Sequence, residues 1–210
     1  MKNSICSLYP LILDLKDKNI LIIGGGDVAF RKLKNLLYCK ANITLISQKY
    51  IKKLKNLCNK YNIKTIQRKA RFKDLRKDVF MVIDATDDIK LHKRLYEKCD
   101  REKILLNVVD SPQYCNFIVP AVVKRGDLLI AISTSGKTPF ITKKVRQDIE
   151  KVFDKKWGKY IKICEIIRNE LKSMDKPERV KKKVYNILSK NFICKIEDAR
   201  KLLKKHEIKL

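Results

Sequence analysis

The chain has 210 residues, 45% of them hydrophobic, and 50 Lys and Arg against 23 Asp and Glu give it a formal net charge of +27. This length allows one dinucleotide-binding unit plus a smaller second part. No apolar run approaches the ~18 residues of a membrane span. The segment Met1–Cys6 lacks a signal-peptide core, so we expect a cytoplasmic protein without a membrane partner.

The basic residues are spread along the chain, and aromatic residues do not interleave with them. This distribution argues against nucleic acid as the main partner and favours a basic surface that attracts a polyanionic small molecule. The cysteines form no C-x-x-C pair, so we expect free thiols and no resident metal. They are Cys6, Cys39, Cys58, Cys99, Cys115, Cys164 and Cys194.

Apolar runs and amphipathic segments alternate up to about residue 110. Strands are predicted at 19–23, 42–46, 62–67, 79–84 and 103–109. Helices are predicted at about 27–39, 48–60, 72–76 and 88–101. This alternation is typical of an α/β, Rossmann-type parallel sheet with helices on both faces.

The pattern changes after about residue 112. Strands are predicted at Phe117–Val119 and Leu128–Ile132, with a turn at Arg125–Asp127 between them. A long helix is predicted from Pro139, with an interruption at Gly158. Further helices are predicted at about 159–173, 178–189 and 196–205. We therefore predict a Rossmann NAD-binding domain (1–112), a small β-containing dimerisation and substrate-loop region (113–148), and a helical C-terminal domain (149–210).

A glycine-rich loop follows the first predicted strand. Gly24, Gly25, Gly26, Asp27, Val28 and Ala29 fit the pattern G-x-G-x-x-[G/A]. The first glycine permits a tight turn, the second lets the backbone approach a pyrophosphate, and the small last residue lets helix and strand pack. The helix N-terminus then offers N–H groups to the phosphates. A strand before the loop and a helix after it favour dinucleotide binding over a plain turn.

The second strand lacks the acidic residue that commonly binds the ribose of NAD. Ser47, Gln48 and Lys49 follow this strand, and no acid lies between Asp27 and Asp74. Ser47, Gln48 or the backbone would then hold the adenosine ribose, whereas Lys49 would suit a 2′-phosphate. The residues alone leave NAD and NADP open.

Polar residues also end the fourth and fifth strands, at the edge where doubly wound sheets bind ligands. Ala85 and Thr86 are small enough to line the nicotinamide side of a cofactor, and Asp87 or Asp88 is expected to cap the next helix. Asp110, three residues after Asn107, suits a general acid or base beside a nicotinamide. It equally suits an Asp that caps the turn before a proline.

The segment Ala131–Thr138 departs from the phosphate-binding pattern G-x-x-x-x-G-K-[ST] only in its first residue. Pro139 follows at once, which fits Thr138 as a helix N-cap, and no later strand ends in an Asp for magnesium. We interpret the loop as an anion site on the substrate side rather than as an NTPase site. The candidate substrate-binding residues are Asn107, Ser133, Thr134, Ser135, Lys137 and Thr138. His92 and His206 are expected on helix surfaces.

Together these motifs resemble, in order and spacing, the dehydrogenase/chelatase modules of siroheme synthases. The likeness starts at Tyr9–Leu15 and at Gly24–Ala29 with Arg31 and Lys32. It continues through Ala85–Asp88, Asn107–Asp110 and Ser133–Pro139. The likeness covers about residues 8–155. The resemblance does not include the methyltransferase of the fused enzymes, so we expect a stand-alone form.

The resemblance implies NAD-dependent oxidation of precorrin-2, a polycarboxylate tetrapyrrole, to sirohydrochlorin. In some members it also implies insertion of Fe²⁺, as a substrate, to give siroheme. Asp110 would serve dehydrogenation and, where present, chelation. Gly24, Gly26, Asp27 and Val28 would contact the cofactor, with Ser47 and Gln48 near its ribose.

The resemblance also implies a homodimer, held by the elements after the Rossmann unit. Some relatives carry a phosphorylatable serine at the position of Thr134. The alternative interpretation is a non-catalytic dinucleotide-sensing or nucleic-acid-binding protein. That alternative explains the charge and the glycine loop, but it does not explain Asp110 at the ligand edge of the sheet.

Overall fold

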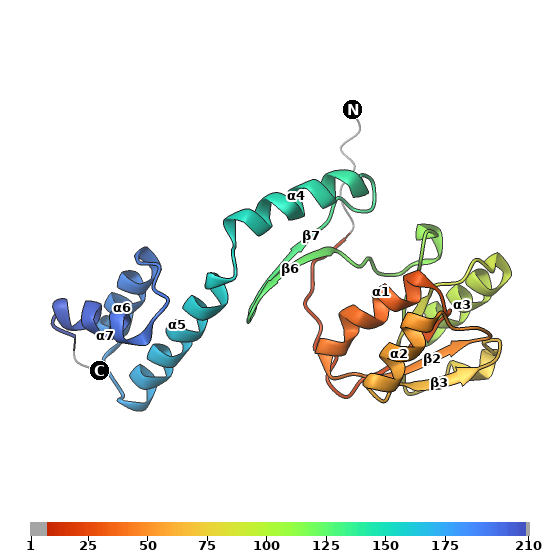
Figure 1. The fold of residues 1–210 in the computed structure, drawn as a ribbon, viewed down its shortest axis with the longest axis horizontal. Coiled ribbons are helices and arrows are strands. Elements are labelled where there is room, and N and C mark those ends of the chain that lie inside the picture. Colours follow the sequence, from red (N-terminus) through yellow and green to blue (C-terminus); the bar gives the residue numbers. More distant parts are fainter. Residues whose placement is uncertain (1–7, 209–210) are drawn as a thin grey trace. The chain divides into compact units, whose positions relative to one another are not determined.

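The computed structural model describes residues 8–208, in two compact units that divide between Val119 and Pro120 (Figure 1). The predictions about Cys6 and the N-terminal segment lie outside these residues. The cysteines within them are free thiols, as expected. In the part of the chain that the structure describes, no helix has the length and apolar character needed to cross a membrane.

The first unit contains a parallel sheet with the strand order β3-β2-β1-β4-β5. The strands are β1 (Asn19–Ile23), β2 (Asn42–Ser47), β3 (Lys64–Gln67), β4 (Val79–Asp84) and β5 (Leu105–Val108). The register pairs Ile23 with Asp84, and Asp84 with Val108, so these carboxyl ends lie at one edge. The strand order reverses between β1 and β4, where open sheets of this kind bind ligands. The predicted α/β, Rossmann-type fold is confirmed.

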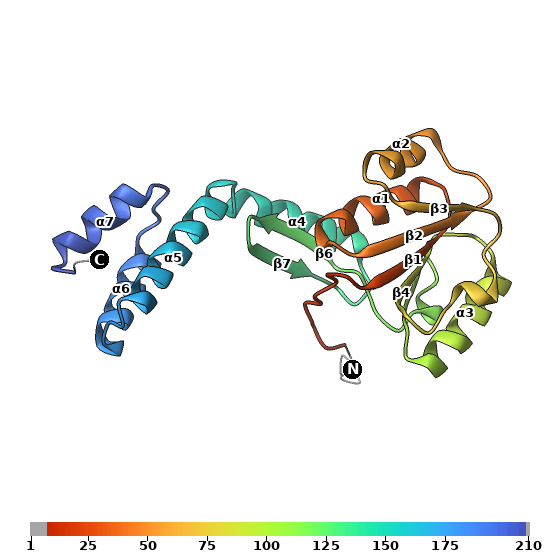
Figure 2. The same ribbon diagram turned by 90° about the horizontal axis from the view of Figure 1, so that it is seen from below.

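Helices cover both faces of this sheet, as Figure 2 shows. The helices α1 (Asp27–Leu36) and α2 (Lys52–Lys60) pack on one face, and α3 (Ile89–Glu102) packs on the other. Alternate residues of β1 point to opposite faces, so Ile20 and Ile22 join the α1–α2 core while Leu21 and Ile23 join the α3 core. Short 3₁₀ turns lie at η1 (Leu37–Cys39), η2 (Phe72–Asp74) and η3 (Pro112–Tyr114).

The second unit consists of an antiparallel hairpin followed by helices. The hairpin strands are β6 (Ala121–Arg125) and β7 (Leu128–Ile132), and the helices are α4 (Pro139–Val152), α5 (Lys156–Ser173), α6 (Glu178–Lys190) and α7 (Ile196–Lys205). Gly126 makes the hairpin turn with a φ of 61°. The helices α5, α6 and α7 share one apolar core, centred on Ile167, Leu171 and Leu203.

Two local predictions are wrong. The strand predicted at Phe117–Val119 begins only at Ala121. The Phe117 carbonyl instead accepts a hydrogen bond from Asn107, and the Phe117 side chain packs on the α1–α2 core. The helix predicted from Pro139 ends at Val152 rather than at Gly158.

The break between α4 and α5 has a different cause from the one predicted. The Arg125 side chain donates a hydrogen bond to the Phe153 carbonyl at 2.7 Å, and the Asp154 carboxylate accepts the Lys156 N–H at 2.9 Å. Gly158 lies inside α5, where a Cβ would come within 3.2 Å of the Gly126 nitrogen in the hairpin turn. The glycine therefore permits a close contact between helix and hairpin.

Candidate functional site

The glycine loop joins β1 to α1 at the carboxyl edge of the sheet. Gly24 has a φ of 120°, and a Cβ there would lie 2.6 Å from the Ala85 carbonyl oxygen. A Cβ on Gly25 would lie 1.8 Å from the Lys49 carbonyl oxygen. Both positions therefore require glycine, because the loop packs between the ends of β2 and β4.

Gly26 differs from its neighbours, since a Cβ there would meet nothing within 4 Å. It is exposed and precedes the first turn of α1, and no side chain caps that helix. The first N–H groups of a helix have no intrahelical acceptor. Open space in front of a glycine at an uncapped helix N-terminus fits the pyrophosphate of a dinucleotide. Asp27 and Val28 begin the helix, and Asp27 forms an ion pair with Lys53.

The end of β2 is held by Tyr50, whose hydroxyl accepts the Ser47 N–H at 3.1 Å and donates to the Ile66 carbonyl at 2.8 Å. The Ser47 hydroxyl donates to the Lys49 carbonyl at 2.8 Å, and Gln48 is exposed. Contacts of Ser47 and Gln48 with a ribose stay a prediction.

The turn after β4 is fixed by two buried side chains. One oxygen of the Asp84 carboxylate accepts the N–H and the hydroxyl of Thr86, at 3.1 and 2.8 Å. His92 Nε2 lies 3.0 Å from the Thr86 carbonyl oxygen and donates to it. Burial raises the pKa of Asp84, against hydrogen bonds from Thr86 that lower it. Ala85 and Thr86 are thereby held against the glycine loop.

The prediction that His92 lies on the helix surface is wrong, because its side chain is only 3% exposed. It faces the sheet from α3 and lies against the ring of Tyr114. His206 is exposed, as expected. The prediction that Asp87 or Asp88 caps α3 is confirmed for Asp88, whose carboxylate accepts the Leu91 N–H at 3.0 Å.

Asp110 lies two residues beyond β5, exposed and with a φ of 58°. Cys115 holds the strand end beneath it, because Sγ accepts the Val108 N–H at 3.1 Å and donates to the Val108 carbonyl at 3.2 Å. Burial raises the pKa of the Cys115 thiol, which favours the protonated form that donates. The carboxylate of Asp110 therefore stands at the ligand edge on a fixed turn.

Lys32 also lies at the candidate site, although the motifs of the sequence did not predict it there. Its Nζ donates to Asn107 Oδ1 at 3.0 Å, which brings α1 to the end of β5. Asn107 is buried, and its Nδ2 donates to the Phe117 carbonyl at 3.3 Å. Substrate binding by Asn107 stays a prediction; in this structure its amide oxygen accepts the hydrogen bond from Lys32. The only signal in the sequence was the Arg31-Lys32 pair within the family resemblance.

In the second unit, the loop between β7 and α4 is closed by its own hydrogen bonds. The Ser135 N–H donates to the Ser133 hydroxyl, the Lys137 N–H to the Thr134 carbonyl, and the Thr138 N–H to the Thr134 hydroxyl. The Thr134 hydroxyl also bonds that of Thr142 at 2.8 Å. The exposed ammonium of Lys137 is thus the main cation that this loop offers an anion.

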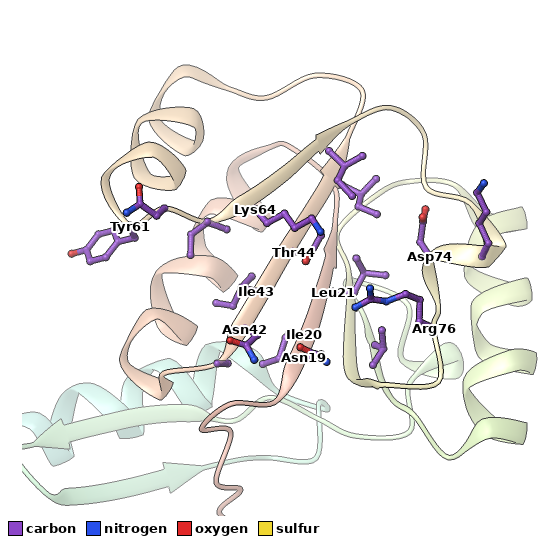
Figure 3. Close-up of a pocket in the computed structure, with 17 residues that line it drawn as sticks. Asn19, Ile20, Leu21, Asn42, Ile43, Thr44, Tyr61, Lys64, Asp74 and Arg76 are labelled. Atoms are coloured by element: carbon purple, nitrogen blue, oxygen red, sulfur yellow. The ribbon is translucent and has the colours of Figure 1, made fainter.

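A cavity of about 560 Å³ lies elsewhere on the first unit, over one face of β1, β2 and β3 (Figure 3). The connection from β3 to β4 contains only η2, so this connection places no long helix over that part of the sheet. Asn19, Asn42 and Lys64, which begin their strands, line it, and none of the predicted site residues does. Among residues 8–208, no group of three or more His, Cys, Asp or Glu could hold a metal ion.

A model of an NAD(P)-binding family matches residues 11–121, just over half of the chain. The chain belongs to this NAD(P)-binding family. The glycine loop, Thr86 and Asp110 follow the strand ends at the carboxyl edge of the sheet, which makes this edge the candidate site for the dinucleotide. The open space at Gly26 is compatible with a phosphate there.

Similar proteins agree with the predicted resemblance to siroheme synthase modules. The chain is 35% identical over 155 residues to a siroheme synthase of Buchnera aphidicola, which covers 74% of this chain and 33% of the relative. It is 33% identical over 199 residues to that of Vesicomyosocius okutanii, covering 91% and 42%. The chain thus spans a third to two fifths of the length of these relatives.

One solved structure matches almost end to end. It is "SirC, precorrin-2 dehydrogenase", with a TM-score of 0.77 and 26% identity, covering 95% of this chain and 99% of that chain. The sheet, the hairpin and the helical region of this chain therefore follow the fold of that solved structure.

Proposed function

We propose that this chain catalyses the NAD-dependent dehydrogenation of precorrin-2 to sirohydrochlorin. The supporting observation is that Asp110 and the open position at Gly26 stand at the same edge of one sheet, in a family whose solved relative carries that activity. We assign Gly24, Gly25, Gly26, Asp27 and Val28 to the pyrophosphate side of the cofactor. Ser47 and Gln48 then serve its ribose, and Ala85 and Thr86 serve its nicotinamide side.

In this reaction the substrate loses a hydride and a proton. Bound NAD⁺ supplies the hydride acceptor. The Asp110 carboxylate accepts the proton, a task that suits an exposed carboxylate on a rigid turn. The Asp84 and His92 side chains hold the Thr86 turn in place while substrate and cofactor exchange. The net charge of +27 attracts the polycarboxylate substrate.

The test is to incubate the full chain with precorrin-2 and NAD⁺ under anaerobic conditions and to record absorption spectra. Formation of NADH together with sirohydrochlorin is expected. Parallel reactions with NADP⁺ decide between the two cofactors, and reactions with Fe²⁺ show whether siroheme also forms. Absence of NADH and of sirohydrochlorin with either cofactor would refute the proposal.

We further propose a cytoplasmic homodimer in which residues 1–112 bind the cofactor, 113–148 form most of the dimer contact, and 149–210 form a helical domain. The support is a set of exposed apolar side chains on the hairpin and on α4, a helix without a buried residue. They are Val122, Leu129, Phe140, Ile141, Val145 and Val152. Apolar surface of this kind is commonly covered by a second copy.

Light scattering at micromolar concentration should therefore give the mass of a dimer for the full chain. A chain shortened to end at residue 112 should be monomeric or insoluble, because it lacks the hairpin and α4. Phe140→Glu should weaken the dimer, since it introduces a charge into the apolar set, whereas the exposed Lys143→Glu serves as a control. A monomeric full chain would contradict the proposal.

The β7–α4 loop is proposed to bind substrate carboxylates through Lys137. Lys137→Ala should raise KM for precorrin-2 more than it lowers kcat, because the lost contact stabilises ground state and transition state alike. ATP should neither bind at millimolar concentration nor be hydrolysed, since the N–H groups of Ser135, Lys137 and Thr138 already donate within the loop. ATPase activity that disappears in Lys137→Ala would revive the alternative of a phosphate-binding loop.

A further inference from the structure

Lys32 differs from most of the basic residues in its surroundings. Its side chain is half-buried, and its ammonium is fixed at the end of β5 by the 3.0 Å hydrogen bond to Asn107. Asn107 cannot readily turn away, because its other amide atom donates to the Phe117 carbonyl. The position of the Lys32 charge is therefore set by buried neighbours rather than by solvent.

This ammonium has no direct ion-pair partner in the described part of the chain. Within residues 8–208, Lys32 forms no ion pair, and its one hydrogen bond is to a neutral amide. Burial lowers the pKa of Lys32, while Cys115 and the Asp110 carboxylate act against this. A partly buried ammonium without an ion-pair partner is unfavourable, and an anion that enters the site relieves that penalty. Lys32 is thus prepared for an anionic ligand.

Two anions would be present in the site during the proposed reaction: the cofactor pyrophosphate and the substrate carboxylates. The pyrophosphate is expected at Gly26 and the first N–H groups of α1. Lys32 stands in the second turn of α1, and its ammonium is tied to β5, two residues before the turn that carries Asp110. A substrate carboxylate near the catalytic residue fits this place better than a phosphate.

We propose that Lys32 binds a carboxylate of the tetrapyrrole substrate and so positions the macrocycle beside Asp110. This inference rests on the proposed function. Among the many lysines of the chain, this half-buried one would contact the substrate inside the site. No bond to Lys32 is made or broken; the ammonium and the carboxylate form an ion pair strengthened by partial burial.

The experiment measures binding without turnover. Sirohydrochlorin is titrated into the full chain, and NAD⁺ binding is measured separately, for the unmodified protein, Lys32→Met and Lys34→Met. Lys34 is an exposed lysine of the same helix, so its replacement removes the same charge from solvent. Lys32→Met should weaken sirohydrochlorin binding about ten- to a hundredfold, as for loss of one charge-assisted hydrogen bond. Lys34→Met should change it less than about twofold, as for a screened surface charge.

Stability separates ligand binding from a structural role. Removing an ammonium without an ion-pair partner should leave the Tm of Lys32→Met equal to or above that of the unmodified protein, and NAD⁺ affinity should be unchanged. Should Lys32→Met instead unfold, Lys32→Arg keeps the charge and must retain most of the sirohydrochlorin binding. Failure of that rescue overturns the inference.

Three further outcomes overturn it. Unchanged sirohydrochlorin affinity in folded Lys32→Met removes Lys32 from the substrate site while leaving the proposed function intact. Weaker NAD⁺ binding with normal sirohydrochlorin binding assigns the ammonium to a cofactor phosphate. If the unmodified protein neither binds sirohydrochlorin nor oxidises precorrin-2, the proposed function fails, and this inference fails with it.

Discussion

Asp110→Asn should lower the rate of NADH formation from precorrin-2 by about 10²–10⁴-fold while NAD⁺ binding stays normal. Asn keeps the size of the side chain but cannot accept the proton. It also tolerates the left-handed backbone of this position, where φ is 58°. Asp110→Ala should abolish NADH formation as well, but alanine at this φ adds strain that would complicate the comparison.

The matched control is Asp100→Asn, which changes an exposed acid on α3 away from the carboxyl edge. Its turnover should be that of the unmodified protein. Single-turnover measurements at saturating precorrin-2 and NAD⁺ separate a slow proton transfer from weak binding. Turnover of Asp110→Asn close to that of the unmodified protein would remove Asp110 from the mechanism.

Gly26→Val should lose NAD⁺ binding by at least about a hundredfold, because a branched side chain occupies the space expected for the pyrophosphate. The fold should tolerate the change. A Cβ at Gly26 meets no protein atom within 4 Å, and its φ of −93° is open to any residue. Calorimetric titration with NAD⁺ and thermal unfolding of the same sample measure the two effects.

Gly25→Ala provides the contrast, since its Cβ would lie 1.8 Å from a backbone oxygen. This variant should lose stability, whereas Gly26→Val should lose affinity alone. Sirohydrochlorin binding should survive in Gly26→Val. A folded Gly26→Val protein with undiminished NAD⁺ affinity would show that the glycine loop does not contact the cofactor.

The sequence predicts most of the sheet well because β1, β2, β4 and β5 are short, largely apolar runs whose side chains need burial. The strand β1 is predicted residue for residue, and β5 is found within the longer range predicted for it. The glycine loop and Asp110 could also be placed, because the ends of parallel strands necessarily meet at one edge. The apolar pattern of a strand and the spacing of a motif are local properties, so they can be recognised in a single sequence.

The misplaced features depend on contacts between residues far apart in the chain. His92 is buried because the Thr86 turn and Tyr114 close over it, and nothing in the helical pattern of α3 indicates this. Lys32 is held at the candidate site only through Asn107, 75 positions away. The break between α4 and α5 likewise depends on a distant contact, because Arg125 of the hairpin donates a hydrogen bond to the carbonyl of Phe153, just after α4.

The Cys115 thiol has a consequence for inhibitor studies. It bonds both backbone groups of Val108, so any adduct on its sulfur must push the strand end, and Asp110 with it, out of place. Alkylating reagents that reach this half-buried thiol would then inactivate the protein, and a bound ligand at the edge would protect it. Such protection is commonly taken as the mark of a nucleophilic cysteine. In this fold it would instead report the position of a carboxylate five residues earlier in the chain.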